Sequence, residues 1–461
     1  MMLIFNRNKL FNCVFNILFC FVSVVFYINA PINYSFLFCL SILILFTFQN
    51  IIYFLLNKEG VGFESLFMIS FLMCNFIYPV FYYGNSSYVS MFVFGFNENI
   101  ISKSTSLAFL GYSFYLLGIT NYVKRDSFYM QIKNSNIVVS KNIFVLVFLS
   151  SFLSFSFFVL AGGLQQLKEI YNGSGAQWGE TGLFSYISIF STLYTILLSA
   201  LVFLINDKLI RWGAIVYILV VAFLMLSTGS RTIPISLILI LLVSYSFFIK
   251  KISLPLLLIS IFLGANLMYF LVLFRELGMD RANSFDNAFS LYKNSNSFFD
   301  IFMDLISNNR NLYVLTDFVD NFETVGFLNV LTEILSVVPG SGFLNKYFTI
   351  PDFMVAGQLP TYLQFGSGSL YGLGTNMVGE SYLSYGFWGV ICIFYFLGVL
   401  IRFVKNRASQ SIYFLVIFFI LVGNSLFMPR ADYLYSLRMY FWISIFLFFT
   451  TFLVKKVLKL R

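Results

Sequence analysis

The chain has 461 residues, of which 59% are hydrophobic and only 10% are charged, and its mean hydropathy is +0.87. Soluble domains average about 25% charged residues, so this composition excludes a soluble globular protein and indicates an integral membrane protein. The chain has no histidine, which removes the commonest general base and metal ligand, and its five cysteines lie in apolar runs without metal or disulfide spacing.

Apolar runs long enough to cross a bilayer follow one another along most of the chain. At about 20 residues for each span, they predict an all-α, polytopic membrane protein with about twelve transmembrane helices. The first run follows Arg7 and Lys9 and has no cleavage site after it, so we interpret it as an uncleaved span. The expected spans lie near residues 10–28, 32–56, 65–83, 104–122, 141–161, 183–205, 211–228, 232–249, 253–273, 376–401, 409–428 and 438–454.

The distribution of charge predicts how these spans are oriented. With the N-terminus in the cytoplasm, the inner segments hold 18 basic and four acidic residues, and the outer segments hold ten basic and 15 acidic residues. Basic loops are retained on the cytoplasmic side, so we expect both termini in the cytoplasm. The net charge of +9 is then a topology signal, and nucleic acid is not an expected partner.

One long polar stretch interrupts the spans. Residues 274–375 separate an N-terminal membrane region, 1–273, from a C-terminal membrane region, 376–461, and the orientation places the stretch outside the membrane as a large extracytoplasmic loop. We expect the short run 87–96 to lie at the membrane interface.

Within the large loop, two segments have apolar residues at helical spacing. Residues 297–322 and 327–338 therefore predict short amphipathic helices that rest on the membrane surface. The part from 340 to 374 is rich in Gly, Pro, Ser and Tyr, which predicts irregular loop.

Arginines on the outer side are scarce, so each is a candidate for a functional role. Arg231 follows Thr228-Gly229-Ser230 in a tight outer turn, where a charge so close to hydrocarbon needs a partner or a function. It either extends to lipid phosphates or binds a phosphate or pyrophosphate with its planar guanidinium. Arg275, directly after an expected span, is placed similarly, whereas Arg281 could simply be solvated.

A further candidate is Arg310. If its segment is helical, Arg310, Tyr313, Asp317 and Asn321 share one face of the helix. A structural salt bridge between Arg310 and Asp317 and a functional role for Arg310 are both open.

Two more candidates lie after the loop. Glu380, at the outer end of the span 376–401, is the most constrained of the outer carboxylates, because burial there would perturb its pKa. No pair of carboxylates has a spacing that selects a base. Arg430 lies on another short outer turn and could join the same cationic cavity.

Two short motifs resemble those of a known group of membrane proteins. Thr228-Gly229-Ser230-Arg231 is similar to the Gly-Ser-Arg turn of the bacterial O-antigen polymerase and ligase superfamily. The segment Gly372-Leu373-Gly374-Thr375-Asn376, followed by residues 380–389, resembles the part in which the family's large loop re-enters the membrane. The likeness covers the whole chain in topology and is greatest to the oligosaccharide repeat unit polymerases. Ligases typically carry His-Asn where this chain has Thr375-Asn376, which disfavours a ligase.

The resemblance implies a metal-independent, inverting glycosyltransferase, without a cofactor, in the inner (cytoplasmic) membrane of a bacterium. Its partners would be oligosaccharides linked to undecaprenyl pyrophosphate, the lipid bilayer and a chain-length regulator protein. It would transfer a growing glycan of an O-antigen or capsule-like polysaccharide from undecaprenyl pyrophosphate to a sugar hydroxyl of a new lipid-linked repeat unit.

The resemblance also implies roles for the candidate residues. Preorganised arginines would stabilise the departing pyrophosphate where a metal otherwise would, with Arg231 first, then Arg310 and Arg275. Glu380 would orient or deprotonate the acceptor hydroxyl. Substrate-binding roles are expected for Arg281, Asp317, Asn376, Arg430 and Tyr313, and no metal ligands are expected.

A flippase for lipid-linked oligosaccharides, or another polysaccharide exporter, is the alternative from a different class. Exporters usually carry charged residues within their spans, along the transport path. Here the span interiors are almost free of charge and polarity is concentrated in one outer loop, so we favour the enzyme.

Overall fold

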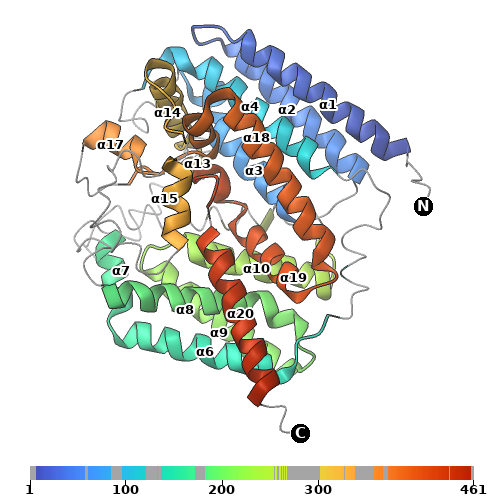
Figure 1. The fold of residues 1–461 in the computed structure, drawn as a ribbon, viewed down its shortest axis with the longest axis vertical. Helices are drawn as coiled ribbons and strands as arrows, with labels where there is room; N and C mark the ends of the chain where they lie inside the picture. The colour runs from blue at the N-terminus through green and yellow to red at the C-terminus, as the bar shows by residue number, and fades with distance from the viewer. Residues whose placement is uncertain are drawn as a thin grey trace.

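The computed structural model is an assembly of helices, and its described residues contain no strand (Figure 1), which confirms the all-α expectation. The structure describes residues 7–57, 61–84, 96–120, 132, 137–171, 182–253, 302–326, 328–337, 357–366, 372–435 and 437–457, with isolated positions in 255–266.

Each expected span coincides with a described helix, except 253–273, which lies mostly outside the described residues. Seven of the described helices are long and apolar enough to cross a membrane, and the others in this set are shorter or less apolar. The long helices are α1 (Arg7–Ile28), α2 (Phe36–Asn57), α6 (Lys141–Leu160), α8 (Gly182–Leu201), α9 (Lys208–Ser227), α18 (Met377–Ala408) and α20 (Leu437–Val457). The others are α3 (Phe63–Asn75), which is followed by the π-helical turn η1 (Tyr78–Tyr82), α4 (Ile101–Ile119), α10 (Thr232–Phe248) and α19 (Ile412–Asn424).

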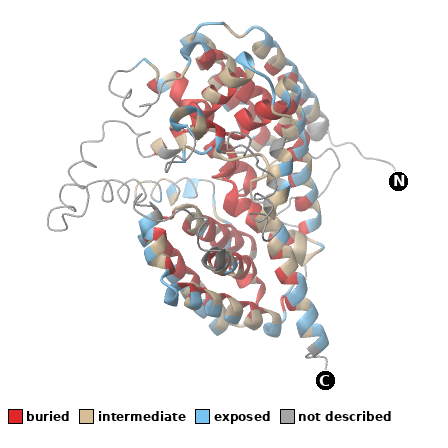
Figure 2. Cartoon of the chain, turned by 60° about the vertical axis from the view of Figure 1, so that its left-hand side comes forward, coloured by how far each residue is buried: buried red, intermediate tan, exposed pale blue. Residues whose placement is uncertain are grey.

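The helices pack in two groups that α19 joins. In Figure 1, α1 to α4 and α18 lie together, and α6, α8, α9, α10 and α20 form the second group. Helix α19 contacts both α18 and α10. Buried residues face the interior of each group and exposed residues face outward (Figure 2), and many of the exposed ones are large and apolar, as lipid-facing side chains are.

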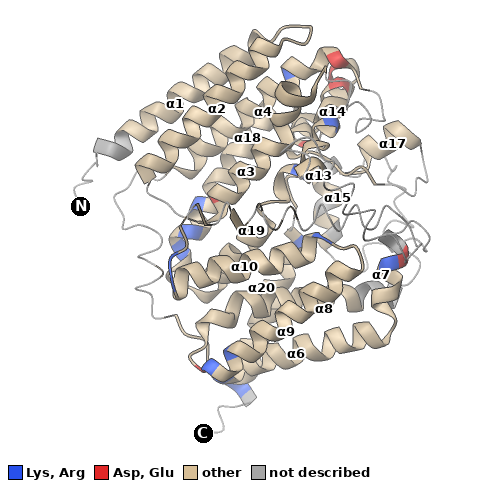
Figure 3. Ribbon diagram, turned by 180° about the vertical axis from the view of Figure 1, so that it is seen from behind, with Lys and Arg blue, Asp and Glu red and all other residues tan. Residues whose placement is uncertain are grey.

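The two ends of the bundle differ in charge. Lys and Arg gather at one end, where both chain termini lie (Figure 3), and we call this the basic end. It contains the ion pairs of Lys141 with Asp207 (3.0 Å) and of Lys405 with Glu64. The helices of the large loop lie at the opposite end (Figure 1), which we call the loop end.

Helices α4 and α18 pack closely against each other, because glycines remove the side chains between them. A Cβ on Gly118 would lie 2.3 Å from the Tyr395 carbonyl oxygen, and a Cβ on Gly398 would lie 2.3 Å from that of Tyr115. Small residues allow membrane helices to approach in this way. This contact fixes the position of α18 and therefore of the loop-end residues that α18 carries.

We expect Gly398→Ala to lower the free energy of unfolding by about 1–3 kcal/mol, because the added methyl group forces the two helices apart. The matched control is Gly213→Ala on α9, where no atom lies within 4 Å of the new Cβ. That change should be neutral or stabilise by up to about 1 kcal/mol, because alanine favours helix. Thermal unfolding in detergent measures both, and equal melting temperatures for the two variants would contradict the close packing.

The large loop forms four described helices, which confirms the expected short helices, and one expectation about it is wrong. The segment 297–322 contains two helices separated by Ser307–Asn308, and the segment 340–374, which was expected to be irregular, contains a helix. The loop helices are α13 (Met303–Ile306), α14 (Asn309–Asn321), α15 (Leu328–Val337) and α17 (Leu359–Phe365).

Helix α14 also differs from its expected place on the membrane surface. Its first two turns are buried against α18 and α4, and there the side chains of Arg310 and Asn311 have hydrogen-bond partners. An amphipathic helix can pack on protein as well as on lipid, and the sequence pattern is the same for both.

Helix α18 contains a break inside the span 376–401, which was expected to be one continuous helix. Tyr385 and Gly386 are not helical, and Gly386 has a φ of 60°, which a glycine adopts without strain. The short part before the break, 377–384, is buried throughout, and the longer part after it crosses the bundle toward the basic end.

Candidate functional site at the loop end

A cluster of asparagines fixes the start of α18. The Asn376 side chain caps this helix by accepting hydrogen bonds from the backbone N–H groups of Val378 (3.0 Å) and Gly379 (3.4 Å). Its Nδ2 donates to Oδ1 of Asn75 (3.1 Å) and of Asn308 (2.9 Å). Asn376 is fully buried, so these bonds join α18 to α3 and to the turn before α14.

The same turn holds the beginning of α14. Asn308 Nδ2 donates to the carbonyl oxygen of Thr375 (2.7 Å), and Asn311 Nδ2 donates to that of Leu373 (2.8 Å). Both asparagines are buried, where each such bond replaces hydration that the side chain has lost. The start of α14 is therefore fixed to the chain that enters α18.

Arg310 lies between these two asparagines. It is only 5% exposed, and its Nη2 donates to Oε1 of Gln364 at 2.6 Å. Burial lowers the pKa of the Arg310 guanidinium to about 10, so the group keeps its positive charge at neutral pH. A buried cation at the loop end thus has an uncharged amide oxygen among its partners.

Glu380 and Arg310 hold the two ends of one segment, 357–364. The Glu380 Oε1 accepts hydrogen bonds from the hydroxyl of Thr375 (2.6 Å) and from the backbone N–H of Gly357 (2.9 Å), directly before α17. Gln364, near the end of α17, bonds to Arg310. Between them, the Leu373 N–H donates to the Thr361 hydroxyl at 2.9 Å. Helix α17 therefore lies across the start of α14 and α18.

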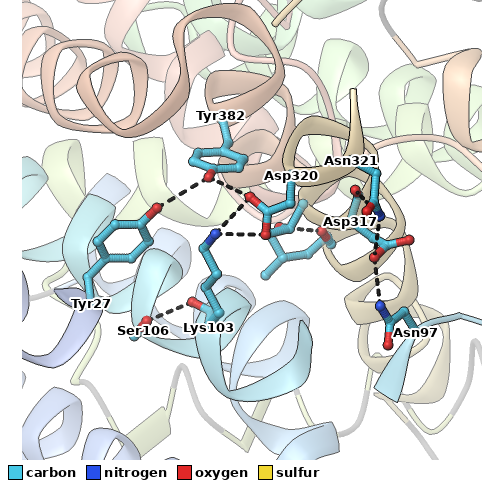
Figure 4. A network of polar contacts seen from close by, with 10 residues as sticks. Tyr27, Asn97, Lys103, Ser106, Asp317, Asp320, Asn321 and Tyr382 are labelled. Carbon is cyan, nitrogen blue, oxygen red and sulfur yellow. Dashed lines mark hydrogen bonds and ion pairs between the residues drawn. The ribbon is translucent and has the colours of Figure 1, made fainter. Parts of the chain in front are cut away.

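A second polar network holds the far end of α14 (Figure 4). Asp320 accepts from Lys103 Nζ at 2.7 Å and from the Tyr382 hydroxyl at 2.9 Å, and the Tyr382 and Tyr27 hydroxyls are 3.2 Å apart. Nearby, Asp317 accepts from Asn97 Nδ2 at 2.8 Å. Helix α14 is anchored at both ends, so Arg310 has a fixed place in the bundle.

Comparison with known families decides what kind of protein presents this site. The family model described as O-antigen polysaccharide polymerase Wzy matches residues 10–461. The chain belongs to this family. No curated protein and no solved structure matches it. The Wzy family gives the chain a role in polymerising polysaccharide repeat units in a membrane, and its apolar helices agree with a multi-pass membrane protein.

For this Wzy-family chain, the structure brings three of the expected site residues together. Arg310, Asn376 and Glu380 each bond to a different residue, Gln364, Asn308 and Gly357, in the region where α14, α17 and α18 join. Asp317 lies two turns along α14, in the second network. Their roles in catalysis or substrate binding stay predictions.

Tyr313 lies on α14 but is fully buried. Its ring packs against those of Phe96 and Tyr78, at centroid distances of 5.1 and 6.1 Å. This position favours a packing role over the expected contact with substrate.

Two of the remaining candidates lie on other elements of the described structure. Arg231 precedes α10, which packs on α8, α9 and α19. Arg430 is in the short helix η7 (Met428–Arg430), which contacts α3 and α18, and its guanidinium lies 5.6 Å from the centre of the Phe427 ring. Arg275 and Arg281 lie outside the described residues.

Sequence reasoning missed Gln364, Asn308 and Asn311. The density of asparagine in 308–311 was a usable signal, because amides are costly to bury without partners. Gln364 had no such signal, since its partner is 54 residues away. Among the residues that the structure describes, no three His, Cys, Asp or Glu side chains lie together as a metal site would need.

Proposed function

We propose that this chain polymerises lipid-linked repeat units as an inverting, metal-independent glycosyltransferase. A hydroxyl oxygen of the incoming repeat unit attacks the anomeric carbon of the growing glycan. The new glycosidic bond forms as the bond from that carbon to the pyrophosphate breaks. Undecaprenyl pyrophosphate leaves with the electron pair, and the proton of the acceptor hydroxyl passes to the released pyrophosphate. Attack opposite the leaving group inverts the anomeric configuration.

The observation that carries this proposal is the buried guanidinium of Arg310 in a chain of the Wzy family. Negative charge develops on the departing pyrophosphate, and a fixed cation in a dry site stabilises it more than one in water would. Arg310 needs little reorganisation for this role, because asparagines on both sides fix the start of its helix. Its planar fork suits two phosphate oxygens at once.

In this proposal, Gln364 bonds to the Arg310 guanidinium until the pyrophosphate binds there. Its amide oxygen is a neutral acceptor, whereas a pyrophosphate presents charged oxygens that can accept two parallel hydrogen bonds from the guanidinium. The pyrophosphate can therefore replace Gln364 at the guanidinium. Helix α17 would shift as it does so, which makes this helix a cover over the site.

Glu380 is assigned the role of ordering the acceptor side. Its Oε1 already receives hydrogen bonds from Thr375 and Gly357, which fix the chain at the junction of α17 and α18. The acceptor hydroxyl would be oriented at this junction.

The placement of charge favours the polymerase over an exporter. Among the described residues, the buried charged side chains are Glu64, Lys405, Arg310 and Glu380. The first two form an ion pair at the basic end, and the other two lie at the loop end. An exporter would carry charged residues along its path through the membrane.

Purified protein in detergent, supplied with lipid-linked repeat units, separates these two functions. A polymerase extends the glycan without a bilayer, because no transport is required. Extension to a ladder of products supports the proposal. If the units stay single in detergent but cross the membrane of vesicles that contain the protein, the chain is an exporter.

A second experiment tests the expected role of Arg231. We expect Arg231→Ala to insert normally but to abolish long surface glycan, leaving single repeat units, because a cation beside the pyrophosphate is lost. Gel analysis of the surface polysaccharide measures chain length. Arg407→Ala at the basic end, where this guanidinium lies 4.9 Å from the Phe403 ring, is the control and should keep a normal ladder. A normal ladder from Arg231→Ala would exclude a catalytic role.

A further inference from the structure

A groove runs along α18 immediately after its break. Its volume is about 840 Å³. Trp388, Cys392, Phe396 and Leu400 line it at four-residue spacing, so they form one stripe on the helix. Tyr433 and Leu434, from the turn before α20, complete the lining nearest the loop end. None of the lining residues is charged.

The stripe is open to the surroundings rather than covered by protein. Trp388 is 69% exposed, Phe396 65% and Leu400 52%. The neighbouring face of α18 is buried against α4 through Val390, Phe394 and the Gly398 contact. The groove is thus a hollow on the outer surface of a membrane helix.

The dimensions of the groove match a hydrocarbon chain. Residues 388–403 extend about 22 Å along a helix at 1.5 Å per residue, which is most of the hydrocarbon thickness of about 30 Å. A peptide would need polar groups to satisfy its backbone at this depth, and the lining offers almost none. A lipid tail has no such need.

The groove adjoins the candidate site. Tyr433 lines the groove, and its hydroxyl lies 2.9 Å from Oγ of Ser384, whose hydroxyl also donates to the Glu380 carbonyl oxygen at 2.9 Å. The groove therefore begins one helical turn from the residue that holds α17. A lipid whose pyrophosphate reaches Arg310 must carry its tail into the membrane from this end.

We propose that the groove along α18 binds the long isoprenoid chain of the lipid-linked donor. This inference rests on the proposed function, since it takes the donor to be a polyprenyl pyrophosphate. The break at Tyr385–Gly386 separates the part of α18 that holds the polar site from the part that holds the tail. The groove binds the tail while the loop end binds the pyrophosphate and sugar.

Cys392 provides a probe inside the groove. It is exposed, whereas Cys20, Cys39 and Cys74 are buried and Cys13 is half-buried. A Cys13→Ser variant in phosphatidylcholine nanodiscs can be labelled at Cys392 with an apolar maleimide. We expect undecaprenyl pyrophosphate without sugar to slow this labelling about tenfold at saturation, and inorganic pyrophosphate to leave the rate unchanged.

A kinetic experiment tests the groove independently of the thiol. Leu400→Trp narrows the groove, and we expect it to raise the KM for the lipid-linked donor about tenfold with a much smaller change in kcat, because the tail contributes to binding rather than to chemistry. Leu153→Trp on α6 places the same bulk at a site that is 65% exposed and should keep the wild-type KM.

The outcomes separate the groove from the polymerase. If undecaprenyl pyrophosphate does not slow labelling of Cys392, ordinary phospholipid fills the groove and the inference is wrong. The same holds if the two tryptophan variants have equal KM values. If labelling is slowed but the protein extends no repeat units, the groove binds the isoprenoid chain as proposed and the proposed polymerase activity is wrong.

Discussion

Replacing Arg310 by lysine should reduce chain extension by purified protein about a hundredfold or more while the protein stays folded. Removing one preorganised donor at a developing oxyanion costs about 10²–10³ in kcat. Lysine keeps the charge but loses the planar fork that binds two phosphate oxygens. The effect should appear mainly in kcat, because the charge on the leaving group develops in the transition state.

The control for this variant is Arg402→Lys at the basic end. The Arg402 Nη1 donates to the Thr120 carbonyl oxygen at 2.9 Å, so it too is an arginine that bonds a neutral oxygen. Its replacement should leave chain extension near the wild-type rate. Equal rates for the two lysine variants would show that Arg310 only supports the fold.

The Gln364→Glu variant should weaken donor binding strongly, whereas Gln364→Ala should not. A carboxylate at this position would pair with Arg310 and compete with the pyrophosphate for it. Hydrogen bonds to charged groups contribute about 1.5–3 kcal/mol, which corresponds to a rise in the donor KM of about tenfold to a hundredfold. Alanine removes the neutral amide and leaves the guanidinium available.

Gln358→Glu is the matched control on the same segment. Gln358 is exposed and directly precedes α17, where a negative charge at a helix N-terminus is tolerated. Its KM should stay near the wild-type value. If Gln364→Glu also keeps a wild-type KM, the pyrophosphate does not bind at Arg310.

The membrane architecture could be predicted from the sequence because the bilayer itself constrains it. A span needs a fixed length of apolar residues, so hydropathy places each helix whatever it packs against. The positions of α18 and α4 follow from this. Their close contact at Gly118 and Gly398 does not, because nothing local to either glycine identifies its partner.

The candidate site was predicted only in part, since it is built from contacts between distant segments. Arg310 and Glu380 stood out because charge near a membrane is costly. The contacts around them did not stand out. Asn308 and Asn376 bond to each other across 68 residues, and Gly357 bonds to Glu380 through a backbone N–H, which any residue except proline could offer. The expected groups of site residues therefore joined Arg310 with residues that come from other elements, such as Arg231 before α10.

The burial of α14 was missed for a related reason. Its apolar face predicts a helix that covers something, and lipid and protein satisfy that face equally. The pattern does not reveal the partners of α14 in the bundle, such as Lys103, whose ion pair with Asp320 links the helix to α4. This pairing spans 217 residues of the chain.

The central claim is that the pyrophosphate of the donor binds at Arg310. A cryo-electron microscopy structure with a bound donor analogue, such as a phosphonate that cannot transfer its glycan, tests this most directly. The account predicts phosphate density within hydrogen-bonding distance of the Arg310 guanidinium, with Gln364 displaced and α17 shifted. Density for the phosphates at a different site, with the bond between Arg310 and Gln364 intact, would contradict it.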